Sequence, residues 1–413
     1  MSAQARTIFF VVLISLAGGL QAQSFLEQYG FGQVQPEADV VGQGMGGITV
    51  LPMGLRSSHF SLPASWHRAR RTKLQIGLIH NGIEVDGGGS FSRDALQNFQ
   101  FLAHLTNRAA FGVVLRPLTR VDISFLDATR NTIIGGDSLA YDQHRTVSGG
   151  QSALAVGYSR RINSRLSLGL ALDVIFGTLT QADTLNIFTT SDHSGDLFEQ
   201  LVAEQRYEFS GRVLALSLLA DQVGVPAGLL GFQVRIPLGL TIVNHFRNSS
   251  LGTASQNRRI EAGLPLEARL GYGFSPAPNH LLAAELGWSA LAKSDANELV
   301  FGNHIEKTYD LRLGWSKVPV GAEKLEPGRL YYRVGFYYRR YYLSRSNNES
   351  LGEIGLTAGL GYRSLRTGHR LDLALQLGRR AAPAGIGEER FVSLALGVTT
   401  GELWFLRPKK KWD

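Results

Sequence analysis

The sequence predicts an all-β fold, a transmembrane antiparallel β-barrel of about 14 strands with an N-terminal hatch or plug segment. Three observations predict this fold. The chain begins with an export signal, apolar residues then recur at every second position through most of its length, and short and long connections alternate between the resulting segments.

Composition alone does not identify the fold. The 413 residues are 44% hydrophobic, as in many water-soluble proteins. A soluble chain of this length would divide into domains, because single cores rarely grow beyond about 250 to 300 residues. A membrane barrel escapes that limit because lipid covers its outer surface, so the pattern of residues must decide.

Residues 1–23 are predicted to be a secretory signal peptide. Arg6 precedes an apolar run from Ile8 to Leu16, and small residues follow up to Ala22. This run is shorter than the roughly 20 residues of a membrane-spanning helix, so an uncleaved anchor is the weaker interpretation. The chain is therefore expected in the bacterial outer membrane.

Cysteine content and charge exclude several functions. The chain has no cysteine, which rules out disulfides, thiolate metal sites and a cysteine nucleophile. We expect no cofactor and no bound metal. The net charge of +8 suits contact with anionic lipid and lipopolysaccharide, and nucleic acid is an improbable partner for an exported protein.

Strand periodicity is clearest between Arg165 and Val174. Leucines at 166, 168, 170 and 172 alternate there with small or polar residues, including Asp173. One face would contact lipid and the other a polar lumen. Equivalent alternation spans residues 72–405, the predicted barrel, and aromatic residues gather at segment ends, as in an interfacial girdle.

The predicted long outer connections are Glu84–Leu96, Ala128–Val147, Leu179–Ala203, Asn244–Ala262 and Ala292–Asn303. One of them has apolar residues at helical spacing after Asp196, which predicts a helix and a lid over the outer mouth. The lid candidates are Leu197, Phe198, Leu201 and Val202.

Residues 24–71 lack sustained alternation and are rich in glycine. Such a segment could fill the lumen as a hatch, or remain free in the periplasm. Residues 406–413 are expected to form a short basic tail.

The third predicted strand contains Pro117, and proline in a strand indicates an edge, bulge or kink. We expect the alternation of inward and outward side chains to continue unchanged past Pro117. Arg120 and Asp122 would then face the lumen. The expected outward residues are Phe111, Val113, Leu115, Val121, Ile123 and Phe125.

Charged residues of both signs are predicted to face the lumen. Mutual pairing would explain them, or arginines could hold the carboxylate of an amphipathic ligand by forked hydrogen bonds. The arginine candidates are Arg116, Arg235, Arg269, Arg312 and Arg333. No catalytic residue is expected, because neither His193–Ser194 nor His144 with Ser148 matches a nucleophile elbow or has an identifiable acid.

Several local matches resemble the FadL-type family of outer-membrane channels for hydrophobic compounds. Tyr29-Gly30-Phe31-Gly32 and Gly44-Met45-Gly46-Gly47 look like the family's opening, and Leu62-Pro63-Ala64-Ser65 looks like its Asn-Pro-Ala motif with Leu62 replacing the asparagine. The resemblance implies a hatch before a fourteen-stranded barrel, and a kinked third strand that opens a lateral gate, here at Pro117.

The closing residues Gly401–Phe405 look like those of Bacteroidetes and Chlorobi barrels, whose last strand is recognised by the outer-membrane assembly machinery. Two functions remain open. Passive uptake of a hydrophobic or amphipathic small molecule would need a tunnel that ends at a wall opening beside Pro117. A scaffold or shuttle in protein secretion would need a sealed wall and an exposed partner surface.

Overall fold

A computed structural model describes residues 32–52, 57–69, 71–85, 90–134, 137–188, 197–224, 228–248, 256–291, 307–317, 329–344, 350–364, 369–381 and 388–402. The predicted signal peptide, the start of the hatch, the connection at 292–303 and the basic tail lie outside these residues. Among the described residues, no helix is both long and apolar enough to cross a membrane.

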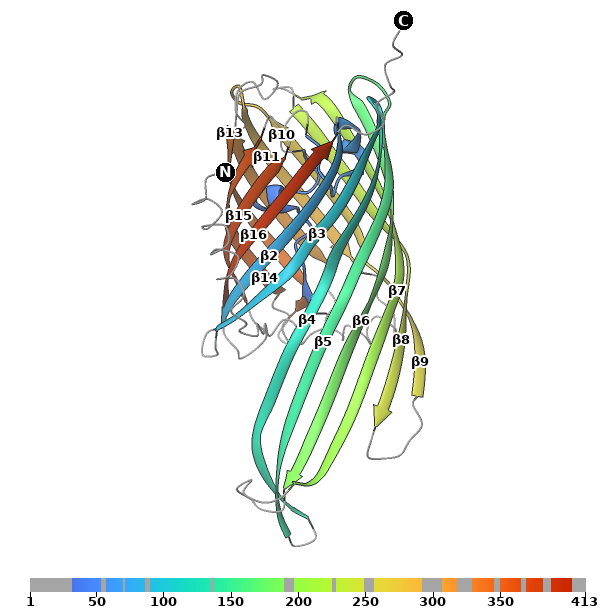
Figure 1. The fold of residues 1–413 in the computed structure, drawn as a ribbon, viewed down its shortest axis with the longest axis vertical. Coiled ribbons are helices and arrows are strands. Elements are labelled where there is room, and N and C mark those ends of the chain that lie inside the picture. Colours follow the sequence, from blue (N-terminus) through green and yellow to red (C-terminus); the bar gives the residue numbers. More distant parts are fainter. Residues whose placement is uncertain are drawn as a thin grey trace, which may run out of the picture.

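The barrel wall is one antiparallel sheet that closes on itself where β16 pairs with β2 (Figure 1). Its strands are β2 (Thr72–Val85), β3 (Ser90–Thr106), β4 (Ala109–Ile134), β5 (Asp137–Arg161), β6 (Leu166–Phe188), β7 (Leu197–Val223), β8 (Gly228–Asn248), β9 (Gln256–Ala262), β10 (Leu266–Phe274), β11 (His280–Ala290), β12 (Thr308–Lys317), β13 (Arg329–Ser344), β14 (Ser350–Arg363), β15 (Arg370–Ala381) and β16 (Glu388–Glu402).

The predicted number of strands is confirmed. Both β9 and β10 pair with β8, at different levels, and only residues 263–265 separate them. They therefore form one interrupted barrel strand, and the barrel has 14 strands.

The alternation in the sequence sorts residues between the two faces of the wall. On β6, Leu168 and Leu170 are 43% and 49% exposed on the outer surface, whereas Asp173 is 3% exposed on the inner one. Apolar side chains thus form the outer belt, and charged side chains face inward.

Strands β4 to β9 continue well beyond the rest of the barrel as an extension (Figure 1). Three predicted long loops, Ala128–Val147, Leu179–Ala203 and Asn244–Ala262, are therefore mostly strand, and Glu84–Leu96 is largely β3. The prediction of long loops is wrong here because strands beyond the lipid need no strict alternation of apolar and polar residues, although their backbone ladder continues.

Backbone irregularities lie where the extension begins. Leu118 is a bulge residue, because Pro117 pairs with Ser152 and Thr119 pairs with Gln151. On β6, Gly177 has φ +151°, and a Cβ there would lie 2.1 Å from the Gly150 carbonyl oxygen. These features bend the strands at the end of the outer apolar belt.

The expected alternation of the third barrel strand, β4, is wrong beyond Pro117, because Leu118 forms a bulge. Beyond it, Val121 and Ile123 are buried on the inner side with Phe209 and Ile242, while Asp122 is exposed. One extra residue exchanges the two faces of a strand. The side chain of Phe125 lies outside the described residues. The inward residues give the extension a hydrophobic core of its own.

Inside the barrel lies the inner segment, defined here as residues 32–52 and 57–69 (Figure 1). It contains β1 (Gln33–Val34), α2 (Val40–Gln43) and the 3-10 helix η2 (Pro63–Arg68). The segment presses on the wall where the wall has glycine: a Cβ on Gly231 would lie 1.8 Å from the Val50 carbonyl oxygen. This close approach requires glycine.

Candidate functional site

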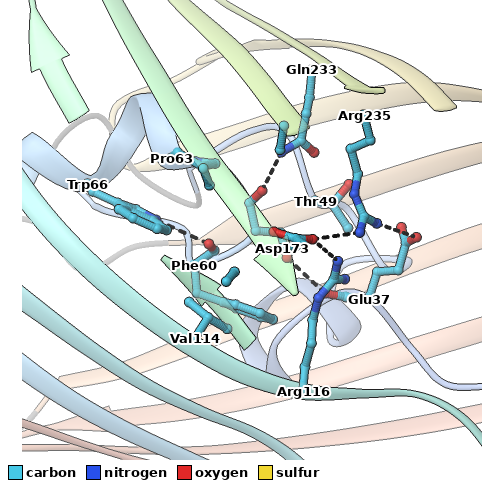
Figure 2. Close-up of a pocket in the computed structure, with 14 residues that line it drawn as sticks. Glu37, Thr49, Phe60, Pro63, Trp66, Val114, Arg116, Asp173, Gln233 and Arg235 are labelled. Atoms are coloured by element: carbon cyan, nitrogen blue, oxygen red, sulfur yellow. Dashed lines mark hydrogen bonds and ion pairs between the residues drawn. The ribbon is translucent and has the colours of Figure 1, made fainter. Parts of the chain in front are cut away.

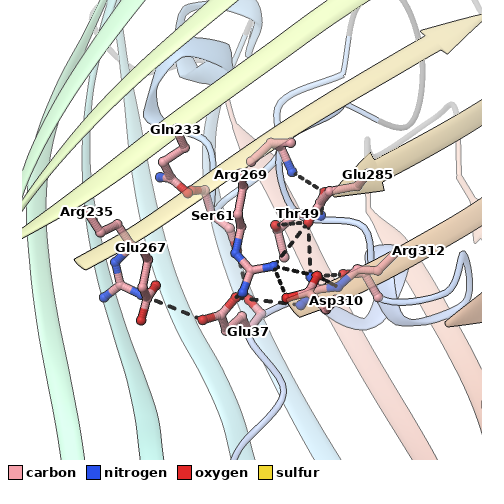
Figure 3. A network of polar contacts seen from close by, with 12 residues as sticks. Glu37, Thr49, Ser61, Gln233, Arg235, Glu267, Arg269, Glu285, Asp310 and Arg312 are labelled. Carbon is pink, nitrogen blue, oxygen red and sulfur yellow. Dashed lines mark hydrogen bonds and ion pairs between the residues drawn. The ribbon is translucent and has the colours of Figure 1, made fainter. Parts of the chain in front are cut away.

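An ion-pair network joins the inner segment to the barrel wall through Glu37 (Figure 3). Its Oε2 lies 2.7 Å from Arg269 Nη2 and 3.9 Å from Arg312 Nη2, and its Oε1 lies 3.8 Å from Arg235 Nη1. Burial raises the pKa of the Glu37 carboxyl, but the charges of Arg269, Arg312 and Arg235 outweigh burial and hold that pKa well below its usual range. Glu37 is therefore ionised.

Glu285 anchors a second part of the inner segment (Figure 3). This fully buried carboxylate accepts hydrogen bonds from the backbone N–H groups of Thr49 and Val50, at 2.6 and 2.9 Å, and from the Thr49 hydroxyl. It also pairs with Arg312 at 3.1 Å. Buried charges need such complete partnering, so this site holds the segment in one position.

A third cluster lies beside the first, around Asp173 on β6 (Figure 2). Asp173 Oδ2 accepts from Arg235 Nη2 at 2.7 Å and from Arg116 Nη2 at 3.3 Å. Next to these charges the picture shows Phe60 and Trp66 of the inner segment. Charged and aromatic side chains therefore line adjacent walls of the same region.

Four of the five arginine candidates meet in this region, and the fifth does not. Arg116, Arg235, Arg269 and Arg312 line one pocket. Arg333 is instead buried against Asp372 at 3.0 Å on the β13–β15 side of the barrel. The structure thus pairs every candidate arginine with a carboxylate.

The pocket has a volume of about 220 Å³ and is amphipathic. Six arginines and three carboxylates, Glu37, Glu267 and Asp310, form its charged side. Its apolar side is formed by Pro117, Leu118, Ile175, Val213, Leu264, Pro265 and Leu291. Such a surface suits a molecule with an anionic headgroup and an apolar body.

The wall next to the pocket contains what we call the β3–β4 break. The ladder between β3 and β4 ends at the pair Phe99–Leu115, and in the described residues no pair joins the two strands outward of it. Both strands keep their other neighbours, β2 and β5. The break therefore begins two residues before Pro117, and Figure 1 shows β4 diverging from β3 beyond it.

The inner segment lies at this break. Val34 pairs with Thr119 in an antiparallel ladder, and the Gln35 N–H donates to the Leu118 carbonyl oxygen at 2.9 Å. Val34 and Gln35 also line the pocket. Strand β1 thus occupies the edge of β4 beside the pocket.

The predicted lid helix is wrong. Leu197, Phe198, Leu201 and Val202 belong to strand β7, where Leu201 pairs with Leu185 of β6. Their apolar spacing fits a helix equally well, but pairing along β6 satisfies the backbone and overrides that local pattern.

Sequence reasoning missed Glu37. It lies in a segment without periodicity, and its partners are more than a hundred residues away in the sequence. The one available signal is Pro36, which marks a turn or extended backbone but indicates nothing about the partner. Glu285 and Asp310 were recognisable only as inward positions.

Solved structures with a similar fold include a hydrocarbon channel, a FadL homologue and a toluene transporter. The structure superimposes on the CymD monoaromatic hydrocarbon channel with a TM-score of 0.57 at 15% identity, covering 91% of this chain and 99% of that one. A Pseudomonas aeruginosa FadL homologue gives a TM-score of 0.56 at 13% identity, covering 90% and 99%. The Pseudomonas putida toluene transporter TodX gives 0.53 at 13%, covering 90% and 98%. These likenesses show the fold of a FadL-type barrel.

Comparison of sequences identifies the family. No curated protein sequence matches the chain. A family model described as BamG matches residues 4–219 and 240–412, which is nearly the whole chain. The chain therefore belongs to the BamG family.

Proposed function

We propose that this protein is an outer-membrane channel for passive uptake of a hydrophobic or amphipathic small molecule. The observation that carries the proposal is the amphipathic pocket at the β3–β4 break, beside Pro117. Pocket and break together offer a binding place and a lateral exit toward the bilayer. Uptake would be driven by diffusion and needs no reaction or cofactor.

In this proposal the ligand enters from the outer mouth and lies with its apolar part against Ile175, Val213 and Leu264. An anionic headgroup, where the ligand has one, lies near Arg235 and Arg269. A guanidinium suits this task because it stays charged and donates two parallel hydrogen bonds to a carboxylate.

Release would occur sideways at Pro117, after β1 leaves the edge of β4. Proline lacks an N–H, and the adjacent bulge at Leu118 turns the outward part of β4 away from β3. The descriptions of CymD as a monoaromatic hydrocarbon channel and of TodX as a toluene transporter support a ligand of this class. Outer-membrane lipid, lipopolysaccharide and, during biogenesis, the assembly machinery are the further proposed partners.

A scaffold or shuttle in protein secretion is the second candidate. The extension favours it, because strands β4 to β9 project beyond the barrel and carry their own hydrophobic core. A stable projecting surface of this kind would suit a protein partner. The pocket and the β3–β4 break have no evident use in that role, and transport explains both.

Reconstituted uptake tests the proposal. Leu264→Trp places a large ring in the pocket, whereas Leu270→Trp makes the same change on the outer face of β10, where Leu270 is 47% exposed. In liposomes, we expect the first variant to lose most uptake of dodecanoate or toluene and the second to match wild type. Equal uptake by both variants, or none by wild type, would overturn transport through this pocket.

A further inference from the structure

The position of Glu37 in the chain connects two parts of the site. It lies two residues after Gln35, whose N–H holds the end of β1 on Leu118. Its own side chain binds Arg269 at 2.7 Å inside the pocket. The same short stretch of backbone therefore carries both the strand on the β4 edge and the anion among the arginines.

Glu37 also has the chemistry expected of a ligand headgroup. It presents one carboxylate to three guanidinium groups, those of Arg235, Arg269 and Arg312. The other carboxylates of the network, Glu285, Glu267 and Asp310, come from barrel strands, whereas Glu37 belongs to the inner segment. Among these acids in the described residues, Glu37 is the one whose departure would not require the wall to move.

We propose that Glu37 occupies the anion position of the pocket, and that an amphiphile with a single carboxylate or phosphate headgroup binds in exchange for it. This inference rests on the proposed function and names the substrate class. An uncharged ligand cannot make the exchange, because removing Glu37 without replacement leaves the buried arginines short of negative charge. The pocket is then selective for anionic amphiphiles.

The exchange has a structural consequence at the wall. Once Glu37 leaves Arg269, this stretch is held on the β4 edge by the two-residue ladder of Gln33 and Val34 and by the Gln35 hydrogen bond. Two further hydrogen bonds hold it elsewhere, from Arg93 Nη2 to Gln33 Oε1 at 3.0 Å and from Ser61 Oγ to the Glu37 carbonyl oxygen at 2.8 Å. So short a ladder is weak by itself. Binding of the headgroup therefore releases β1 from Thr119 and connects the pocket with the β3–β4 break.

Binding measurements with matched probes test the exchange. We compare wild type, Glu37→Gln and Glu388→Gln, a control outside the pocket whose side chain is 54% exposed and lies 4.0 Å from Arg379. The probes are dodecanoate, dodecyl phosphate and uncharged dodecanol. We expect Glu37→Gln to bind both anions about tenfold more tightly, a typical size for coupling between sites, with dodecanol unchanged.

A disulfide reports the position of β1 independently of affinity. The chain has no cysteine, so Val34→Cys with Thr119→Cys gives one possible intramolecular disulfide between direct cross-strand partners. In this background dodecanoate should slow disulfide formation and dodecanol should not. Adding Glu37→Gln should slow disulfide formation without ligand, whereas adding Glu388→Gln should leave it at the parent rate.

The outcomes separate this proposal from the transport proposal. If Glu37→Gln binds the anions no more tightly than wild type, or if dodecanol slows the disulfide as strongly as dodecanoate, the exchange is wrong while uptake can still stand. If only one of the two anions competes, the headgroup is assigned to that chemistry. Should wild type take up none of the probes into liposomes, the transport proposal itself fails. Glu37→Asp, which keeps the charge, serves as a second variant and should bind the anions as wild type does.

Discussion

Glu285 Oε1 lies 3.1 Å from Arg312 Nη1, and the two side chains are 0% and 3% exposed. This buried pair joins β11 to β12 and, through Thr49 and Val50, also holds the inner segment. Because removing one member of a buried pair leaves the other charge uncompensated, the segment depends on this carboxylate more than on any surface ion pair.

Glu285→Gln should therefore loosen the inner segment locally. Its charge is lost and one acceptor oxygen is replaced by a donor, so amide exchange at Thr49 and Val50 should accelerate by about ten- to a hundredfold, as expected for one or two lost charged hydrogen bonds. Hydrogen exchange followed by mass spectrometry measures this. Glu388→Gln is the control, since Glu388 is 54% exposed and 4.0 Å from Arg379. Similar exchange at Thr49 in both variants would contradict the anchoring role.

Gly231→Ala should displace the inner segment from the wall. The added methyl would lie 1.8 Å from the Val50 carbonyl oxygen, a backbone atom that cannot move aside alone. Overpacking of this kind costs about 1 to 3 kcal/mol. Limited proteolysis of the inner segment reports the displacement. Gly352→Ala, whose methyl would meet the Tyr338 ring at 3.5 Å, should be cleaved like wild type; equal resistance of Gly231→Ala would refute the close contact.

Acid should weaken the attachment of η2. Burial, followed by the charge of Arg68, lowers the pKa of His67 to about 4, so His67 is neutral when η2 is docked. A free histidine titrates near pH 6.5, so the undocked form binds more protons as the pH falls from about 6.5 to 4. The contribution of neutral His67 to docking is therefore full above about pH 6.5 and is lost progressively as the pH falls to about 4.

Hydrogen exchange of residues 63–68, corrected for intrinsic rates, should show this loss between pH 7 and pH 4.5. His67→Gln removes the titrating group while keeping a hydrogen-bonding side chain for Ser159. Its exchange should be nearly independent of pH in the same window. A pH dependence that survives this substitution would assign the effect to another group.

The extension should unfold independently of the barrel, because it has a hydrophobic core of its own. Ile242 is fully buried among Val121, Ile123 and Phe209, so Ile242→Ala should destabilise the extension by about 2 to 5 kcal/mol. The neighbouring Leu238→Ala, 57% exposed, should have little effect. Faster exchange in β5 and β7 with an unchanged heat-induced gel shift of the barrel is the expected result. Loss of that shift would show that extension and barrel unfold together.

The barrel wall could be predicted from sequence wherever lipid dictates the pattern. On β6, the alternation of Leu168, Leu170 and Asp173 matches the observed exposure, because a lipid-facing polar side chain is costly. Beyond Gly177 the same strand continues outside the apolar belt. That constraint is absent there, so the continuing strands resembled loops and, at Leu197, a helix.

The site was predictable in part. The alternation of side chains along the strands predicted which arginines face inward. Pro117 marked the part of β4 that is irregular. The bulge at Leu118 was not visible, because one extra residue leaves no trace in composition while it reverses the faces of Val121 and Ile123. The partners of Glu37 depend on contacts between distant segments, which periodicity does not encode.

Uptake through liposomes by the Val34→Cys/Thr119→Cys protein tests the central claim most directly, because the disulfide would fix β1 on the edge of β4. Ala358→Cys with Leu375→Cys, a cross-strand pair on β14 and β15, is the control. We predict that oxidation abolishes dodecanoate uptake in the first protein alone and that reduction restores it. Undiminished uptake by the oxidised protein would show that the ligand does not leave through the β3–β4 break.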